Sequence, residues 1–209
     1  MRLTVTSLKG GTGKTTTAAH LAAGLSGSGL AGPSSTVVAV DADPQGSLLR
    51  WAERADWPSL TEALPTRTIH TSVPKLMAGV QHLVIDTPPG GLPIIASALK
   101  AADLVLVPVQ PSTADLDQMA ETMTVAADAT ALTGAQVVVL LTRVVPRTRA
   151  RVLTRAALVD SGHLVLESEV RQSQSMALAH GRPITELGDY ATVLDELTSI
   201  TGHRKKKRT

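Results

Sequence analysis

The most informative stretch of this chain for its fold is Lys9-Gly-Gly-Thr-Gly-Lys-Thr-Thr16. It follows a short β-prone run, residues 3–7, and leads into residues 17–25, which have helical spacing. A strand, a glycine-rich loop and a helix in this order are the context of a phosphate-binding loop. Glycines let the backbone curl and turn its N–H groups inward, and the following helix start adds further free N–H groups. A glycine-rich turn with a chance lysine is the weaker interpretation.

Each residue of this loop has an expected role. Lys14 is expected to reach the β- and γ-phosphates of a nucleotide, and the Thr15 hydroxyl is expected to bind Mg²⁺. The residues predicted to bind the nucleotide in this loop are Gly10, Gly11, Thr12, Gly13, Lys14, Thr15 and Thr16.

The loop departs from the common form at its first residues. The usual phosphate loop has Gly five residues before the Gly-Lys pair, where this chain has Leu8, and a second lysine, Lys9, opens the loop. The form Lys-Gly-Gly-x-Gly-Lys-Thr resembles the deviant Walker A motif of the ParA/MinD family of ATPases. In that family the additional lysine crosses a dimer interface to the partner's nucleotide, so the resemblance implies catalytic roles for Lys9 and Lys14. The alternative for Lys9 is a solvated loop cation.

A pair of carboxylates follows the next apolar run. Residues 36–41 read as a buried strand that leads into Asp41-Ala-Asp-Pro-Gln-Gly-Ser47. Ligands of open α/β sheets bind at such carboxyl ends of strands. Asp43 is expected to orient a water molecule and Asp41 to support the metal. The matching Asp-x-Asp-Pro-Gln of the ParA family is its first switch and positions the attacking water; an Asx turn before Pro44 is the alternative.

A third carboxylate ends another apolar strand, residues 82–86. An apolar strand closed by Asp86 is the Walker B pattern, in which the carboxylate acts on Mg²⁺, often through water. The Gly-Pro-rich turn of residues 86–91 resembles a second switch. Apolar strands that end in Asp are common, so the Walker B pattern alone indicates little. It indicates a nucleotide site strongly here because it follows the Walker A loop and Asp-x-Asp-Pro-Gln in this order.

The base preference is read from the end of the strand at residues 136–141. Guanine-specific GTPases carry Asn-Lys-x-Asp near this point, whereas this chain has Thr142-Arg143. The absence of that motif favours adenine, so the predicted cofactors are ATP and Mg²⁺. Arg143 is included among the residues predicted to bind the nucleotide.

Composition limits the remaining possibilities. The chain has 209 residues, 43% of them hydrophobic and 18% charged, which is typical of a globular domain. It has no cysteine, which excludes disulfides and thiolate chemistry, and its six histidines show no metal-ligand spacing. Only Trp51, Trp57 and Tyr190 are aromatic by the tryptophan, tyrosine and phenylalanine count, so base stacking on an aromatic platform is not expected.

The predicted fold is α/β, with a three-layer, mostly parallel twisted sheet flanked by helices, as in P-loop NTPases of the deviant Walker A type. Residues 1–202 are expected to form a single P-loop ATPase domain, and residues 203–209 a basic tail. Residues 58–66 read as a polar turn, and residues 170–183 as a helix and turn. Further strands are expected at residues 66–70, 102–109 and 164–167, and further helices at residues 48–54, 73–81, 94–101, 114–127, 149–160 and 189–200.

The charge of the chain is unevenly distributed. It has 20 Lys and Arg against 18 Asp and Glu, and five of the basic residues are Arg204, Lys205, Lys206, Lys207 and Arg208. Without these five, 15 basic residues face 18 acidic ones, a net of −3. No apolar run approaches membrane-spanning length and no targeting segment is evident, so a cytoplasmic protein is expected. The resemblance to the ParA/MinD family implies that it is also nucleoid-associated.

The resemblance covers nearly the whole chain and is greatest for the small ParF-type partition ATPases. It implies an ATP-sandwich homodimer that binds double-stranded DNA non-specifically and segregates a plasmid or chromosome. It also implies weak ATP hydrolysis that a centromere-binding ParB-type partner stimulates. The expected DNA contacts are Arg171, which the resemblance places, and the five basic tail residues. The alternative for Arg171 is a helix-capping or ion-paired arginine, and the alternative for the tail is a disordered, solubilising end. MinD is a poorer match, because the tail has charge but no apolar face to insert into a membrane.

Two other functions remain open. One is an ATPase that positions another cargo on the nucleoid through the same cycle. The other is an ATP-dependent small-molecule enzyme, similar to amidase-synthases or carboxylase-like relatives, which would have no use for Lys9 acting across a dimer.

Overall fold

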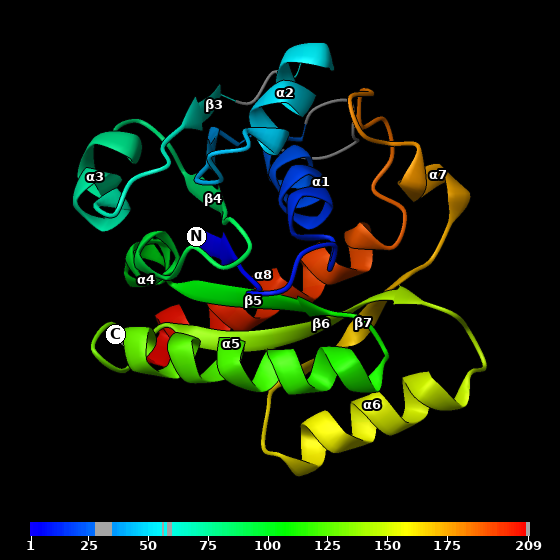
Figure 1. Ribbon diagram of the computed structural model, residues 1–209. Helices are drawn as coiled ribbons and strands as arrows, with labels where there is room; N and C mark the ends of the chain where they lie inside the picture. Colours follow the sequence, from blue (N-terminus) through cyan, green and yellow to red (C-terminus); the bar gives the residue numbers. More distant parts are fainter. Residues whose placement is uncertain (28–34, 56, 58–59, 208–209) are drawn as a thin grey trace.

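A single parallel sheet forms the centre of the molecule (Figure 1). The computed structural model describes the whole chain except residues 28–34, 56, 58–59 and 208–209. Within that part, seven strands lie in the order β3-β2-β4-β1-β5-β6-β7, and every neighbouring pair is parallel. The strands are β1 Arg2–Val5, β2 Val37–Asp41, β3 Leu60–Ala63, β4 His82–Asp86, β5 Leu104–Val109, β6 Gln136–Val144 and β7 Val165–Arg171.

Helices cover both faces of this sheet, as the predicted three-layer fold requires. The apolar residues of α1, α2 and α8 pack in one cluster, and those of α3, α4, α5 and α6 pack in two clusters on the other face. The helices are α1 Lys14–Ser26, α2 Ser47–Arg54, α3 Ile69–Leu76, α4 Leu92–Ala101, α5 Thr113–Ala131, α6 Arg149–Asp160, α7 Gln174–Ala177 and α8 Tyr190–Lys207.

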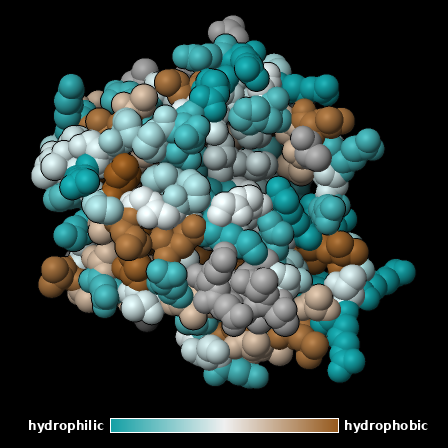
Figure 2. All heavy atoms as spheres, viewed as in Figure 1, coloured by the Kyte–Doolittle hydropathy of each residue, from teal (hydrophilic) through white to brown (hydrophobic). Residues whose placement is uncertain are grey.

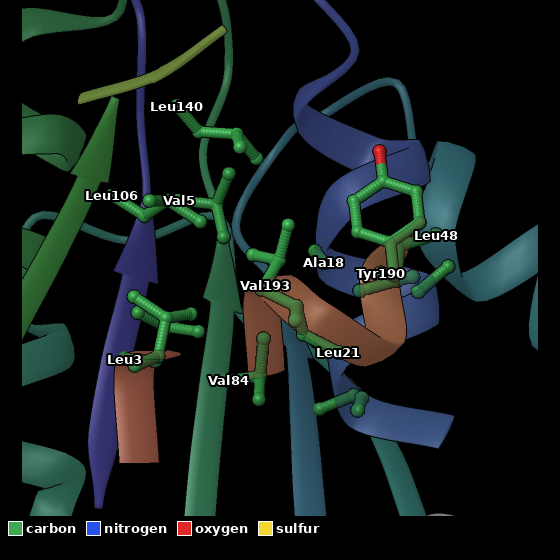
Figure 3. Packing of buried hydrophobic residues seen from close by; sticks show 14 of the residues in the cluster. Leu3, Val5, Ala18, Leu21, Leu48, Val84, Leu106, Leu140, Tyr190 and Val193 are labelled. Atoms are coloured by element: carbon green, nitrogen blue, oxygen red, sulfur yellow. The ribbon is translucent and has the colours of Figure 1, made fainter. Parts of the chain in front are cut away.

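The core is almost entirely aliphatic because the sheet is buried on both sides. All residues of β2 and β5 are buried. Figure 3 shows Leu3 and Val5 of β1 on one side of Val193 of α8 and Ala18 and Leu21 of α1 on the other, and all five belong to one cluster. This packing fixes the ends of β1 and α1, and therefore the loop between them.

The structure corrects two predictions between β2 and β4. Residues 58–66 include the edge strand β3, which pairs with β2, rather than only a polar turn. The strand expected at residues 66–70 is absent, and this segment is a turn followed by the start of α3. Ile69, Val73 and Leu76 lie on the buried face of that helix, so the spacing of apolar residues was helical and not alternating.

Two further corrections concern the C-terminal part. The strand β7 continues to Arg171, and the helix expected across residues 170–183 is only the four-residue α7. The helix α8 extends past the predicted end at residue 200 as far as Lys207, which agrees with the good helix propensity of Lys and Arg. Arg208 lies outside the described residues. The domain boundary at residue 202 stays a prediction.

Figure 2 shows several separate apolar groups, drawn in brown, with polar side chains between them among the described residues of this face. Exposed apolar side chains include Leu92 on α4 and Val152 and Val159 on α6. Among the described residues, no helix combines the length and the apolar character needed to cross a membrane.

Candidate nucleotide-binding site

The glycine-rich loop joins the end of β1 to the start of α1, which begins at Lys14. Gly11 and Gly13 have φ angles of 78° and 92°, in the left-handed region that favours glycine. A Cβ added to Gly10, Gly11 or Gly13 would meet no atom within 4 Å. Gly11 and Gly13 are therefore required by backbone conformation rather than by crowding, and the loop borders open space of the kind that a phosphate group could fill.

Lys14 is folded back over this loop. Its side chain is largely buried, and Nζ donates a hydrogen bond to the carbonyl oxygen of Lys9 at 2.8 Å. Burial lowers the pKa of Lys14, and the nearby Asp86 and Asp43 carboxylates oppose this effect. A phosphate group at the loop would offer the cation a stronger partner than a neutral carbonyl.

Thr15 and Asp86 form the second part of the site. The Thr15 hydroxyl donates to Oδ2 of Asp86 at 2.7 Å. Asp86 is 1% exposed, and its Oδ1 is buried with no hydrogen-bond partner among the described residues. Burial raises the pKa of Asp86 to about 7. A threonine hydroxyl and a carboxylate with a spare oxygen are ligands that suit a hydrated Mg²⁺ ion.

Asp41 lies beside Asp86 on the adjacent strand, and the two are paired in register. Its Oδ1 accepts from the backbone N–H of Asp43 at 3.0 Å, and its Oδ2 from that of Leu49 at 2.9 Å. Asp41 therefore holds the loop between β2 and α2 in place. Its predicted support of a metal stays a prediction.

Asp43 lies in the same loop and forms the Asx turn that was the alternative interpretation. Its Oδ1 accepts from the backbone N–H of Gln45 at 2.9 Å. One carboxylate oxygen of Asp43 thus fixes the turn. The predicted role in orienting water concerns the same side chain and is not tested by this contact.

A cavity of about 650 Å³ continues from the loop along the ends of β6 and β7. Gly13 and Thr16 line one side, and Thr142, Arg143 and Tyr190 line others. Arg143 has a φ of 51°, which is unusual for a residue with a side chain, and the turn brings it to the cavity wall. The fold therefore brings Arg143 to the predicted phosphate loop, as a residue near the base or sugar would require.

Arg171, at the end of β7, also lines this cavity, and it is ion-paired. Its Nη2 donates to Oδ1 of Asp189 at 2.6 Å, and its backbone N–H donates to Oδ2 at 2.9 Å. The ion-paired arginine was the alternative to a DNA contact. Asp189 offsets part of the positive charge of Arg171, although the arginine side chain remains mostly exposed.

The basic residues at the C-terminus are described only in their backbone. Residues 204–207 continue the helix α8, and nothing is described of their side chains. The predicted DNA contacts of this segment therefore stay predictions.

Several residues of the site were not singled out from the sequence. The Gln110 amide and the Thr142 hydroxyl donate to carbonyl oxygens of the loop, those of Gly11 and Thr12. Tyr190 stacks on His20 at 4.7 Å, and its hydroxyl lies 2.9 Å from that of Thr17. The available signal was weak: Gln110 and Thr142 are polar residues at the carboxyl ends of apolar runs, where parallel strands meet.

The fold, the glycine-rich loop and the buried aspartate at the end of β4 define a P-loop nucleotide-binding protein of the deviant Walker A type. The chain belongs to the CobQ/CobB/MinD/ParA nucleotide binding domain family, whose model matches residues 3–184. The resemblance to the ParA/MinD family is thereby confirmed.

Two proteins illustrate which members of this family the chain is similar to. The maintenance of carboxysome distribution protein A of Gloeobacter kilaueensis is 39% identical over 146 residues, which cover 66% of this chain and 61% of that protein. The match therefore spans less than two thirds of that relative's length. The protein ParA of Rhizobium radiobacter is 30% identical over 173 residues, which cover 78% of this chain and 74% of that protein.

Solved structures share the fold at lower identity. A putative plasmid partition protein of Borrelia burgdorferi bound to AMPPNP has a TM-score of 0.71 at 16% identity, over 95% of this chain and 98% of that one. The cobyrinic acid a,c-diamide synthase of Mycobacterium smegmatis, with an ATP analogue and magnesium, has a TM-score of 0.69 at 22% identity, over 86% and 91%. These similarities confirm the predicted fold.

Proposed function

We propose that this protein is an ATPase whose cofactors are ATP and Mg²⁺. The observation that carries the proposal is the contact between Thr15 and the buried Asp86, with a carboxylate oxygen left unpartnered beside the loop of Lys14. Buried polar atoms are normally hydrogen-bonded, so an orphaned oxygen at this position suits a site completed by a bound cation and its water. Magnesium would supply charge neutralisation between the phosphates.

Each residue of the site has a separate proposed role in binding or hydrolysing ATP. Lys14 leaves the Lys9 carbonyl and neutralises the β- and γ-phosphates. Thr15 and Asp86 hold the metal, with Asp41 supporting the arrangement, and the loop backbone from Gly10 to Thr16 binds the phosphates. Asp43 orients the attacking water. Arg143 contacts the nucleoside, and Lys9 acts on the nucleotide of a second copy.

The biological role that we propose is DNA segregation. The ATP form dimerises, binds DNA without sequence preference, and releases it on hydrolysis stimulated by a ParB-type partner. The similarity to a protein named ParA over 78% of this chain supports this role. The protein would then be cytoplasmic and associated with the nucleoid.

A second candidate has support of its own. The 39% identity to a carboxysome distribution protein favours an ATPase that positions a cargo other than a replicon. Fluorescent labelling in the source cell separates the two roles. Deleting the gene should disturb the inheritance and spacing of a DNA element in the first case, and those of a protein body in the second.

Fluorescence anisotropy on a random duplex tests the proposed cycle. Binding should require ATP and Mg²⁺, should be lost with ADP, and should weaken steeply with salt, because phosphate contacts release counterions. A small-molecule synthase, the third possibility, would show no ATP-dependent DNA binding. Absence of binding at low salt with ATP would therefore contradict both segregation and cargo positioning on DNA.

A further inference from the structure

We propose that Gln110 and Thr142 are positioning residues that fix two N–H groups of the glycine-rich loop for phosphate binding. The proposal rests on the proposed function, since it assigns how the ATP site is organised. Gln110 follows β5, and Thr142 lies near the end of β6. Neither residue is part of the loop.

The two side chains bind consecutive peptide groups. Nε2 of Gln110 donates to the carbonyl oxygen of Gly11 at 2.7 Å. Oγ1 of Thr142 donates to the carbonyl oxygen of Thr12 at 2.9 Å. In a planar trans peptide the carbonyl and the following N–H point in opposite directions. Holding these two carbonyls therefore directs the N–H groups of Thr12 and Gly13 away from β5 and β6.

The rest of the loop follows the same arrangement. The carbonyl oxygen of Lys9 accepts from Lys14, and that of Gly13 accepts from the backbone N–H of Thr17 in the first turn of α1. Lys14 must leave its carbonyl to reach a phosphate. Gln110 and Thr142 approach from the side of the neighbouring strands, so their bonds persist when the nucleotide binds.

The sheet order makes this support possible. β1, which leads into the loop, lies next to β5, and β5 lies next to β6, with all three parallel. Their carboxyl ends therefore meet at one edge. Thr142 is 2% exposed, and its hydroxyl also lies 3.4 Å from the carbonyl oxygen of Val109, so it ties the loop to both strands.

Preorganisation is the expected benefit. Gly11 and Gly13 place few restrictions on the backbone, so the loop has many alternative conformations when nothing holds it. Donors that are already aimed at the ligand bind it without a further ordering cost. Removing the side-chain donor of Gln110 or Thr142 would let the peptide group that it holds rotate. The carbonyl oxygen of Gly11 or Thr12 would then lose its hydrogen-bond partner.

Calorimetry with Mg²⁺ tests this inference, using ATP and inorganic triphosphate as separate ligands. Thr142→Val keeps the shape of the side chain and removes the hydroxyl. It should lower the affinity for both ligands by about tenfold, because this is the typical cost of losing one hydrogen bond and leaving its acceptor unsatisfied. Thr142→Ser keeps the donor and should recover most of this loss. Thr130→Val is the matched control, because the Thr130 hydroxyl is buried and donates within its own helix to the carbonyl oxygens of Ala126 and Ala127, away from the loop.

Gln110→Ala covers the case in which a buried substitution impairs folding, since the Gln110 contact is at the surface. It should also weaken both ligands, with thermal unfolding of the nucleotide-free protein little changed. Wild-type affinity in both Gln110→Ala and Thr142→Val would overturn the proposal. So would a loss confined to ATP, because the defect should lie in phosphate binding. Wild-type protein that binds neither ligand would instead contradict the proposed ATPase function.

Discussion

The Thr15 hydroxyl lies 2.7 Å from Oδ2 of Asp86, which joins the first turn of α1 to the end of β4. The two residues are 71 positions apart in the chain. They meet because β4 pairs with β1 in parallel, with Val5 opposite Asp86. The loop and the buried carboxylate therefore form one site, whose properties can be tested residue by residue.

Lys14→Ala should abolish ATP binding or weaken it severely. The lysine neutralises phosphate charge, and charge-assisted hydrogen bonds are about twice as strong as neutral ones. Thr15→Ala should show the same loss together with loss of Mg²⁺ dependence. Isothermal calorimetry checks both, with the exposed helix residue Lys100→Ala as control. Unchanged affinity in Lys14→Ala would show that the loop is not a phosphate site.

Asp86 should make stability depend on pH. Its pKa is raised from 3.8 to about 7 by burial, so the folded protein holds this proton more tightly than the unfolded chain does. Its contribution to the free energy of unfolding therefore falls as the pH rises from about 4 to about 7, and is constant above that. Asp86→Asn resembles the protonated form and removes this dependence.

Thermal unfolding of the nucleotide-free protein measures this effect. The Tm advantage of Asp86→Asn over the wild type should grow as the pH rises towards about 7. Parallel Tm curves for the two proteins would mean that Asp86 does not titrate in this range.

Asp43→Ala should bind ATP but hydrolyse it slowly. A residue that orients water acts on the transition state more than on the bound nucleotide, so the loss appears in kcat. Asp43→Asn is the informative partner, because its amide oxygen can still accept from Gln45 and keep the turn. If Asp43→Asn hydrolyses ATP at the wild-type rate, Asp43 has only the structural role.

The sequence was sufficient to predict the strands next to the site. β2, β4 and β5 are apolar runs closed by polar or turn residues, and such runs are buried in parallel sheets whatever their neighbours are. The region from residue 58 to residue 70 was predicted wrongly. β3 is a four-residue edge strand whose pairing with β2 is a tertiary contact, and no local sequence pattern predicts this strand.

Within the site, the position of the loop between a strand and a helix could be predicted from the sequence, and the contacts that support the loop could not. The residue types and the spacing of a glycine-rich motif are enough to indicate phosphate binding. Gln110 is separated by 99 positions from Gly11, and Thr142 by 130 positions from Thr12. Only the strand order brings these pairs together. The ion pair of Arg171 with Asp189 depends in the same way on where α8 begins relative to β7.

Arg171→Ala should lower the affinity of the ATP form for DNA uniformly across sequences. Each lost phosphate contact should also flatten the slope of log affinity against log salt by about 0.9. Asp189→Asn should have the opposite effect on affinity, because it removes the carboxylate that faces Arg171. Arg2→Ala is a matched control, since Arg2 is ion-paired with Asp103 and lies at the start of β1, at the opposite edge of the parallel sheet from Arg171.

Deleting residues 204–208 tests the C-terminal basic cluster in the same anisotropy assay. The deletion and Arg171→Ala should weaken binding additively. If both changes together leave DNA affinity unchanged, the DNA surface lies elsewhere, and the basic residues Arg149, Arg151 and Arg155 of α6 become the next region to test.

ATP-dependent dimerisation through Lys9 is the central claim. Lys9→Ala removes the side chain but keeps the backbone carbonyl that holds Lys14. Nucleotide binding should therefore largely survive, while the contact with a second copy is lost. This separation makes the variant more informative than changes at Lys14.

Light scattering coupled to a sizing column, with Mg²⁺ and a non-hydrolysable ATP analogue, is the most direct measurement. We predict that the wild-type mass doubles from 21.7 kDa, and that Lys9→Ala remains a monomer although calorimetry shows bound nucleotide. A Lys9→Ala protein that dimerises as the wild type does, or a wild-type protein that stays monomeric with bound nucleotide, would contradict it.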